Sequence, residues 1–146
     1  RTRKFVRRDY IREVENLGGY KVFMAKANGT GAFGETLTPP IVGEPSVGNT
    51  ETFISIGEFY TLSEAMALKK YIATKFVRAL LGALKTTQDI TPEKWKFVPQ
   101  QDFSETSDID WSRSVEEIDA FLYKKYKLTD AEICFINEKV QAMKDV

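Results

Sequence analysis

Histidine is absent from this chain, and Cys134 is its one cysteine among 146 residues. A disulfide within the chain, a zinc site built from cysteine and histidine, and a Ser-His or Cys-His catalytic pair are therefore excluded. No apolar run in the given sequence approaches the length of a membrane-spanning helix, and we expect no signal peptide before the first strand. We expect a cytoplasmic protein without membrane contact. Because the opening at Arg1 reads like the middle of a polypeptide, we also expect a fragment of a longer protein.

Net charge is lacking too, because 21 basic residues balance 21 acidic ones. The charges are unevenly distributed, however. Eight basic residues stand against three acidic ones in residues 1–26, and seven against two in residues 69–96, whereas residues 102–119 hold seven acidic residues and Arg113 alone. A hydrophobic fraction of 42% is enough for a folded core. The sequence therefore predicts a folded, polarised molecule whose local field could attract a nucleic acid.

Hydrophobic periodicity predicts an α+β fold: a small mixed β-sheet backed by a long helix and followed by a C-terminal helical hairpin. Strands are expected at residues 20–27, 52–57 and 95–99, with a glycine- and proline-rich irregular segment at residues 28–50. The long helix is expected to begin with Ser63 as its N-cap and to run to about Leu84. Its apolar face would pack on the sheet.

Both ends of the chain are expected to be helical. A basic amphipathic helix is expected over residues 1–17, and two capping-box spacings predict helices at residues 114–126 and 129–143. Residues 106–112 form an acidic linker in this interpretation. The chain then divides into a basic N-terminal helix continuing a longer parent (residues 1–19), an α+β domain (20–104), and the acidic linker with the helical hairpin (105–146).

The segment Gly29-Thr-Gly31-Ala-Phe-Gly34 matches the G-x-G-x-x-G pattern of dinucleotide-binding loops. Such a loop must open a helix whose N-terminus faces the pyrophosphate. The following Pro39 and Pro40 cannot continue that helix, and the Walker lysine is missing. We therefore interpret the segment as a flexible loop.

Catalytic motifs of DNA-modifying enzymes are missing as well. No Asp or Glu is followed two residues later by lysine, which the common restriction-nuclease site requires. The only Pro-Pro pair, Pro39-Pro40, does not lie in an adenine-methyltransferase motif. Asp108 and Asp110 could bind a metal ion, but a solvated acidic linker is the favoured interpretation. We expect no catalysis in this chain.

The expected long helix carries Lys75, Arg78 and Lys85 on one side, beside its apolar face. Such a row of cations can lie along DNA phosphates, although spacing alone favours a solvated helix face. The turn that follows contains Thr87 and Gln88, whose polar groups suit either capping or base reading. The side chains expected in the core include Trp95, Phe97, Trp111 and Cys134.

Residues 69–103 resemble a pattern found in restriction-modification proteins: a helix with basic residues, a Thr-Gln turn, a strand ending in Val-Pro, and then Asp-Phe. The target-recognition domains of type I specificity subunits and the C-terminal domains of TaqI-like and Eco57I-like adenine methyltransferases share this layout. The glycine-rich segment 26–34, the segment 51–56, and Ile109-Asp-Trp111, Leu122-Tyr-Lys-Lys-Tyr126 and Leu128-Thr-x-x-Glu132 in that order also resemble the Eco57I-like group.

This resemblance implies a non-catalytic domain that binds double-stranded DNA and reads the target sequence for a methyltransferase or nuclease elsewhere in the parent protein. The fragment itself would need no cofactor, whereas the parent methyltransferase would use S-adenosylmethionine and a parent nuclease Mg²⁺. Its partners would be duplex DNA and the rest of the parent polypeptide or its partner subunits. The implied DNA contacts are Lys26, Asn28, Thr30, Lys75, Arg78, Lys85, Thr87, Gln88, Lys94 and Lys96.

Two other functions remain open at the level of sequence. The chain could be a structural domain that docks the methyltransferase, nuclease or motor part of a restriction enzyme onto a partner subunit, which a large exposed apolar patch and no positive concavity would favour. It could also be a nuclease with an unusual metal site around Asp102, Asp108 and Asp110.

Overall fold

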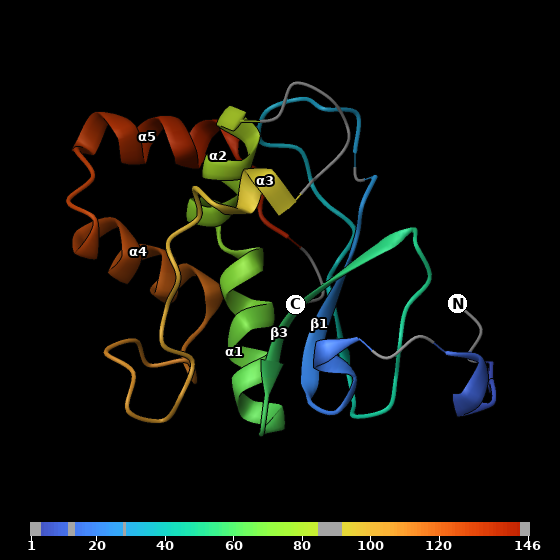
Figure 1. Ribbon diagram of the computed structural model, residues 1–146. Coiled ribbons are helices and arrows are strands. Elements are labelled where there is room, and N and C mark those ends of the chain that lie inside the picture. The colour runs from blue at the N-terminus through green and yellow to red at the C-terminus, as the bar shows by residue number, and fades with distance from the viewer. Residues whose placement is uncertain (1–3, 12–13, 28, 85–91, 144–146) are drawn as a thin grey trace.

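The computed structural model describes residues 4–11, 14–27, 29–84 and 92–143 (Figure 1). It has an α+β fold, as the periodicity predicts. A three-stranded sheet lies on one side, and α1 (Leu62–Ala73) contacts all three of its strands. The helices α4 (Val115–Lys125) and α5 (Asp130–Lys139) lie on the far side of α1 and α2 (Lys75–Leu84) from the sheet.

The sheet has the order β2-β1-β3 and is antiparallel throughout its described part. Its central strand is β1 (Tyr20–Ala25), flanked by β2 (Ile41–Gly43) and β3 (Phe53–Phe59). Val22 pairs with Val42 on one side and with Ile56 on the other. The expectation of a mixed sheet is therefore wrong.

The third strand also lies elsewhere than expected. Residues 95–99 are not a strand; α3 (Pro92–Trp95) ends there and a turn follows. Proline at the first helical position has the fixed φ of a helix and lacks only an N–H that would be unpaired anyway. The strand is instead β2, inside the segment expected to be irregular. Its β-branched Ile41 and Val42 pair with β1 directly after Pro40.

The expected long helix is two helices, α1 and α2, separated at Thr74. Thr74 has an extended ψ of 148° and lies fully buried. Its hydroxyl donates to the carbonyl of Tyr71 at 2.7 Å and accepts the N–H of Val77 at 3.2 Å, so it acts as the N-cap of α2. The N-cap of α1 is Thr61 rather than Ser63, within a capping box with Glu64.

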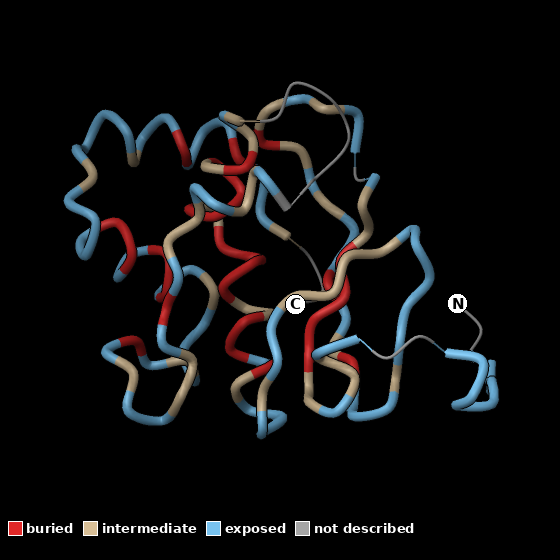
Figure 2. Tube along the Cα trace, viewed as in Figure 1, coloured by how far each residue is buried: buried red, intermediate tan, exposed pale blue. Residues whose placement is uncertain are grey.

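The predicted helices near the C-terminus are confirmed. Ser114 with Glu117 opens α4, and Thr129 with Glu132 opens α5, each through a complete capping box. The buried core runs along β1, α1 and α2 and continues into the inner sides of α4 and α5 (Figure 2). In the described part of the chain, none of the helices has the length and apolarity needed to cross a bilayer.

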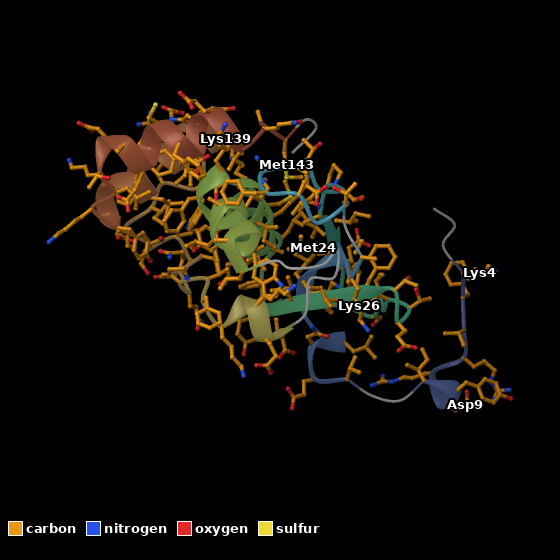
Figure 3. The ribbon with its side chains drawn as sticks, turned by 90° about the horizontal axis from the view of Figure 1, so that it is seen from above. Lys4, Asp9, Met24, Lys26, Lys139 and Met143 are labelled. Atoms are coloured by element: carbon orange, nitrogen blue, oxygen red, sulfur yellow. The ribbon has the colours of Figure 1, made fainter. Side chains whose placement is uncertain are left out.

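The N-terminal segment does not form the expected helix. Its described residues contain two short 3₁₀ turns, η1 (Arg8–Tyr10) and η2 (Glu15–Leu17). Figure 3 shows Lys4 and Asp9 lying apart from the body of the molecule. Phe5 and Tyr10 are exposed by 103% and 75%, so the apolar face has nothing to pack on. An amphipathic helix gains most of its stability from such packing, and this explains its absence.

The glycine-rich loop predicted after β1 is confirmed, since no helix begins in residues 35–40. The carboxylate of Glu35 accepts the backbone N–H groups of Thr30 and Gly31 at 2.6 and 2.9 Å. Gly34, at φ +77°, accepts the N–H of Gln141, and a Cβ there would lie 1.9 Å from the carbonyl oxygen of Lys139. The loop is therefore fastened to the end of α5.

Candidate nucleic-acid interface

A groove of about 610 Å³ lies between the first turn of α2 and the two C-terminal helices. We call it the α4–α5 groove. Its apolar part is formed mainly by α4, by the turn after it and by one residue of α5, and charged or amide side chains surround this part. The lining residues are Lys75, Glu116, Asp119, Ala120, Tyr123, Lys124, Lys127, Leu128, Ile133 and Asn137.

Lys75 occupies the first position of α2 because Thr74 interrupts the preceding helix. Asp119 of α4 fixes this start, since its carboxylate accepts the N–H of Lys75 and that of Phe76, both at 2.8 Å. The first N–H groups of a helix lack partners within it and favour a negative charge nearby. The ammonium group of Lys75 then reaches α5, where it donates to the side-chain oxygen of Asn137 at 3.2 Å.

Lys127 lies where α4 ends and has a φ of +54°, in the left-handed region. The N–H of Leu128 returns to the carbonyl of Tyr123 at 2.9 Å, which closes the helix end. Glycine is the usual residue at such a position, because a side chain there costs about 1 kcal/mol. A lysine is present instead, and its side chain lines the α4–α5 groove. Strained positions of this kind are concentrated at functional sites.

A buried polar cluster lies at the base of the groove, where Asp119 and Tyr123 also form part of the lining. Asp119, Arg78 and Tyr123 are only 5%, 3% and 6% exposed. Burial raises the pKa of Asp119 to about 6, and the hydrogen bonds from α2 and the charge of Arg78 offset this only in part. Burial also raises the pKa of Tyr123 and lowers that of Arg78. Arg78 donates to the carbonyl of Gln141. The cluster thus ties α2, α4 and the C-terminal segment together.

The groove is positively charged at its rim. Lys75, Lys124 and Lys127 surround it, and among its exposed lining residues only Glu116 is acidic. In the described ranges of the chain, none of the three lysines forms an ion pair. Two other described lysines are paired with carboxylates, Lys96 with Glu93 at 2.5 Å and Lys125 with Asp108 at 2.8 Å. Within the described lining, three lysines without ion pairs stand against Glu116 and the buried Asp119, and this excess of positive charge favours anions.

The residues predicted from sequence to contact DNA are not brought together. Lys75 lines the groove, whereas Arg78 is buried behind it, so the expected exposed row on the helix is wrong at Arg78. Lys75 lies at the start of α2 beside the groove. Arg78, three residues further along the helix, is covered by the packing of α4 and by the C-terminal segment, where it donates to the carbonyl of Gln141. Figure 3 places Lys26 on the sheet side, away from α5.

The remaining predicted contacts lie elsewhere or outside the described residues. Thr30 hydrogen-bonds to Glu35 within its own loop. Lys94 is half-buried within α3, and Lys96 is bonded to Glu93. Four predicted residues lie outside the described ranges: Asn28, Lys85, Thr87 and Gln88.

Sequence reasoning did not single out Lys124, Lys127 or Asn137, because every DNA contact implied by the resemblance lies between residues 26 and 96. The run Lys124-Lys125-Tyr126-Lys127 was the available signal. Lys125 points elsewhere, toward Gln101 and Asp108. Only the fold shows which lysines of this run share a groove.

Some other side chains differ from expectation. Cys134 is exposed rather than buried, and Glu138, whose Oε1 lies 3.5 Å from its sulfur, raises the pKa of the thiol. Phe97 is 64% exposed, whereas Trp95 and Trp111 pack against the core as predicted. The indole N–H of Trp111 donates to the carbonyl of Asp102 at 2.9 Å.

The aspartates considered as metal ligands are engaged in local bonds. Asp108 pairs with Lys125, and Asp110 accepts from Ser112 and Arg113. Among the residues that the structure describes, no group of three or more His, Cys, Asp or Glu side chains could hold a metal ion. The nuclease alternative around Asp102, Asp108 and Asp110 therefore has no supporting geometry in the described residues.

Comparisons of the chain with protein-family models, with curated proteins and with solved structures found no match.

Proposed function

We propose that this chain is a non-catalytic module that binds double-stranded DNA, with the α4–α5 groove as its main phosphate-contacting surface. The observation that carries the proposal is the convergence of Lys75, Lys124 and Lys127 on one concavity. Glu116 and the buried Asp119 also line it, but no ion pair joins a described carboxylate to any of the three lysines. Each lysine that neutralises a phosphate releases a condensed counterion, which is the main source of affinity for duplex DNA. In the setting that the sequence resemblance implies, the module would hold DNA for a methyltransferase or nuclease part of the parent protein.

The positions of the three lysines suit phosphate contacts. Lys124 and Lys127 are exposed, and Lys75 is held at the groove by Asn137. Phosphate contacts fix the position of a protein on the duplex but carry no sequence information. Target reading would therefore depend on other residues, among them those predicted in the glycine-rich loop and in the turn after α2.

The test compares two triple variants that each remove three positive charges. One changes the groove (Lys75→Gln, Lys124→Gln, Lys127→Asn), and the other changes three of the predicted lysines outside it (Lys26→Gln, Lys94→Gln, Lys96→Gln). Asparagine is chosen at Lys127 because it tolerates the left-handed conformation. Fluorescence anisotropy with a labelled duplex at low ionic strength measures the affinity.

We expect the groove variant to bind on the order of tenfold or more weakly and the other variant to retain most of the affinity. A larger loss in the second variant would place DNA on the surface predicted from sequence and overturn the role of the groove. No duplex affinity in the unaltered chain would overturn the proposal altogether.

A docking domain is the second candidate, favoured by the exposed apolar side chains of the N-terminal segment. Phe5, Tyr10 and Val14 are 103%, 75% and 55% exposed. Exposed apolar groups in such number are typical of contact surfaces. If this segment docks on another subunit, Phe5→Ser with Tyr10→Ser should abolish that association without changing duplex affinity.

A further inference from the structure

The floor of the α4–α5 groove is apolar, and contacts with duplex phosphates do not need an apolar surface. It is formed by Ala120, Tyr123, Leu128 and Ile133. Its volume of about 610 Å³ lies within the range of small-ligand pockets, roughly 300–1,000 Å³. In a duplex the bases are stacked inside, so only the charged backbone would meet this groove. The apolar floor therefore indicates a ligand with both an apolar and an anionic part.

We propose that the groove binds one unpaired nucleotide of a DNA strand, with its base on the apolar floor and its flanking phosphates at the lysines. This rests on the proposed DNA-binding function. Proteins that bind single strands combine a positively charged groove with aromatic side chains on which the bases stack. Tyr123 and Leu128 supply the floor, and Lys124 and Lys127 stand next to them on the same helix end.

The spacing of charge around the floor fits this ligand. Lys75 approaches from α2, on one side of the groove, and Lys127 follows the end of α4. A strand that crosses the groove would thus meet an ammonium group before and after the bound base. The Asn137 amide at the α5 rim can bond a base edge, although its oxygen already accepts from Lys75. An acidic amphipathic peptide is the competing occupant, and the test includes it.

The substitution that tests the floor is Ala120→Leu. Ala120 is exposed on α4 and lines the groove, so leucine would fill the floor without altering charge. Alanine and leucine are both strong helix formers, and α4 should remain folded. The matched control is Ala131→Leu, at an exposed position of α5 outside the groove. Circular dichroism melting checks the fold of each variant.

Three labelled ligands are compared by fluorescence anisotropy with the whole chain: a short thymidine strand, an abasic strand of the same length, and a duplex. Because the two single strands carry the same charge, their difference isolates the base. We expect the unaltered chain to bind the thymidine strand about tenfold tighter than the abasic strand. Ala120→Leu should abolish that preference, whereas Ala131→Leu, outside the groove, should leave both the preference and the duplex affinity unchanged.

Equal affinity of the unaltered chain for the two single strands would overturn the nucleotide site, even if duplex DNA binds. If the unaltered chain does not bind the duplex but still prefers the thymidine strand over the abasic strand, the proposed function is overturned and the nucleotide site is retained. Binding of an acidic amphipathic peptide, with no preference for the thymidine strand, would assign the groove to a protein partner and overturn the nucleotide site.

Discussion

The Oδ1 atom of Asp119 on α4 accepts the backbone N–H of Phe76 on α2 at 2.8 Å. The second oxygen of the same carboxylate accepts the N–H of Lys75, so one side chain pairs two of the first N–H groups of α2. The hydroxyl of Thr74 pairs the next one, at Val77. Through these bonds α4 determines where α2 begins and therefore where Lys75 meets the α4–α5 groove.

The stability contributed by Asp119 should decrease as pH rises. Because burial raises its pKa from 3.8 in the unfolded chain to about 6 in the fold, the folded state holds the proton more tightly. The contribution is thus complete below pH about 4, is lost as pH rises through about 6, and is constant above.

Urea unfolding of the unaltered protein and of Asp119→Asn, measured across this range, checks this prediction. Asparagine keeps one acceptor and cannot titrate. The free energy of unfolding of the unaltered protein, relative to that of the variant, should decrease by on the order of 3 kcal/mol between pH about 4 and pH about 7. Asp130→Asn, at an exposed position of α5, is the control. If the free energy of unfolding of the unaltered protein, relative to that of Asp119→Asn, increased toward neutral pH, this result would contradict the raised pKa of Asp119.

Lys127→Gly should separate stability from binding. Glycine adopts the left-handed conformation without strain, so the free energy of unfolding should rise by about 1 kcal/mol. The lost ammonium group should at the same time weaken duplex binding. Ser46→Gly is the matched control, because Ser46 has a φ of 64° and lies outside the groove. It should gain stability without losing affinity, and an equal effect of both variants on DNA would argue against a role for Lys127.

Arg78→Met should act in the opposite way. The guanidinium group is buried, donates to Gln141 and lies near Asp119, so its loss should lower the free energy of unfolding by about 1–3 kcal/mol. Duplex affinity, measured where the variant is fully folded, should remain within about twofold. Lys124→Gln should show the reverse pattern. If Arg78→Met lost affinity without losing stability, Arg78 would be a DNA contact as the sequence had predicted.

The elements that depend on local patterns were predictable. Alternating β-favouring residues locate β1 and β3, and the Ser-x-x-Glu and Thr-x-x-Glu spacings locate the starts of α4 and α5. The break at Thr74 was not, because the apolar periodicity continues from Ile72 to Phe76 across it. The partner that stabilises the break is Asp119, 44 residues beyond Lys75, and no local pattern reports such a contact.

The candidate site shows the same division. Lys75 could be proposed from its place in a basic helix, but the burial of Arg78 follows from the packing of α4 and of the segment after α5. Lys124 and Lys127 could not be assigned to a site from sequence, because they line a groove that forms only when α2, α4 and α5 pack together. The N-terminal helix failed for a related reason, since its amphipathic spacing has no surface to pack on.

The salt dependence of duplex binding tests the central claim most directly. For each variant, the logarithm of the binding constant is plotted against the logarithm of the salt concentration, and the slope reports the number of phosphates neutralised. If Lys75, Lys124 and Lys127 each contact a phosphate, the triple groove variant should have a slope shallower than that of the unaltered chain by about 2 to 3. An unchanged slope would show that DNA does not contact the groove lysines.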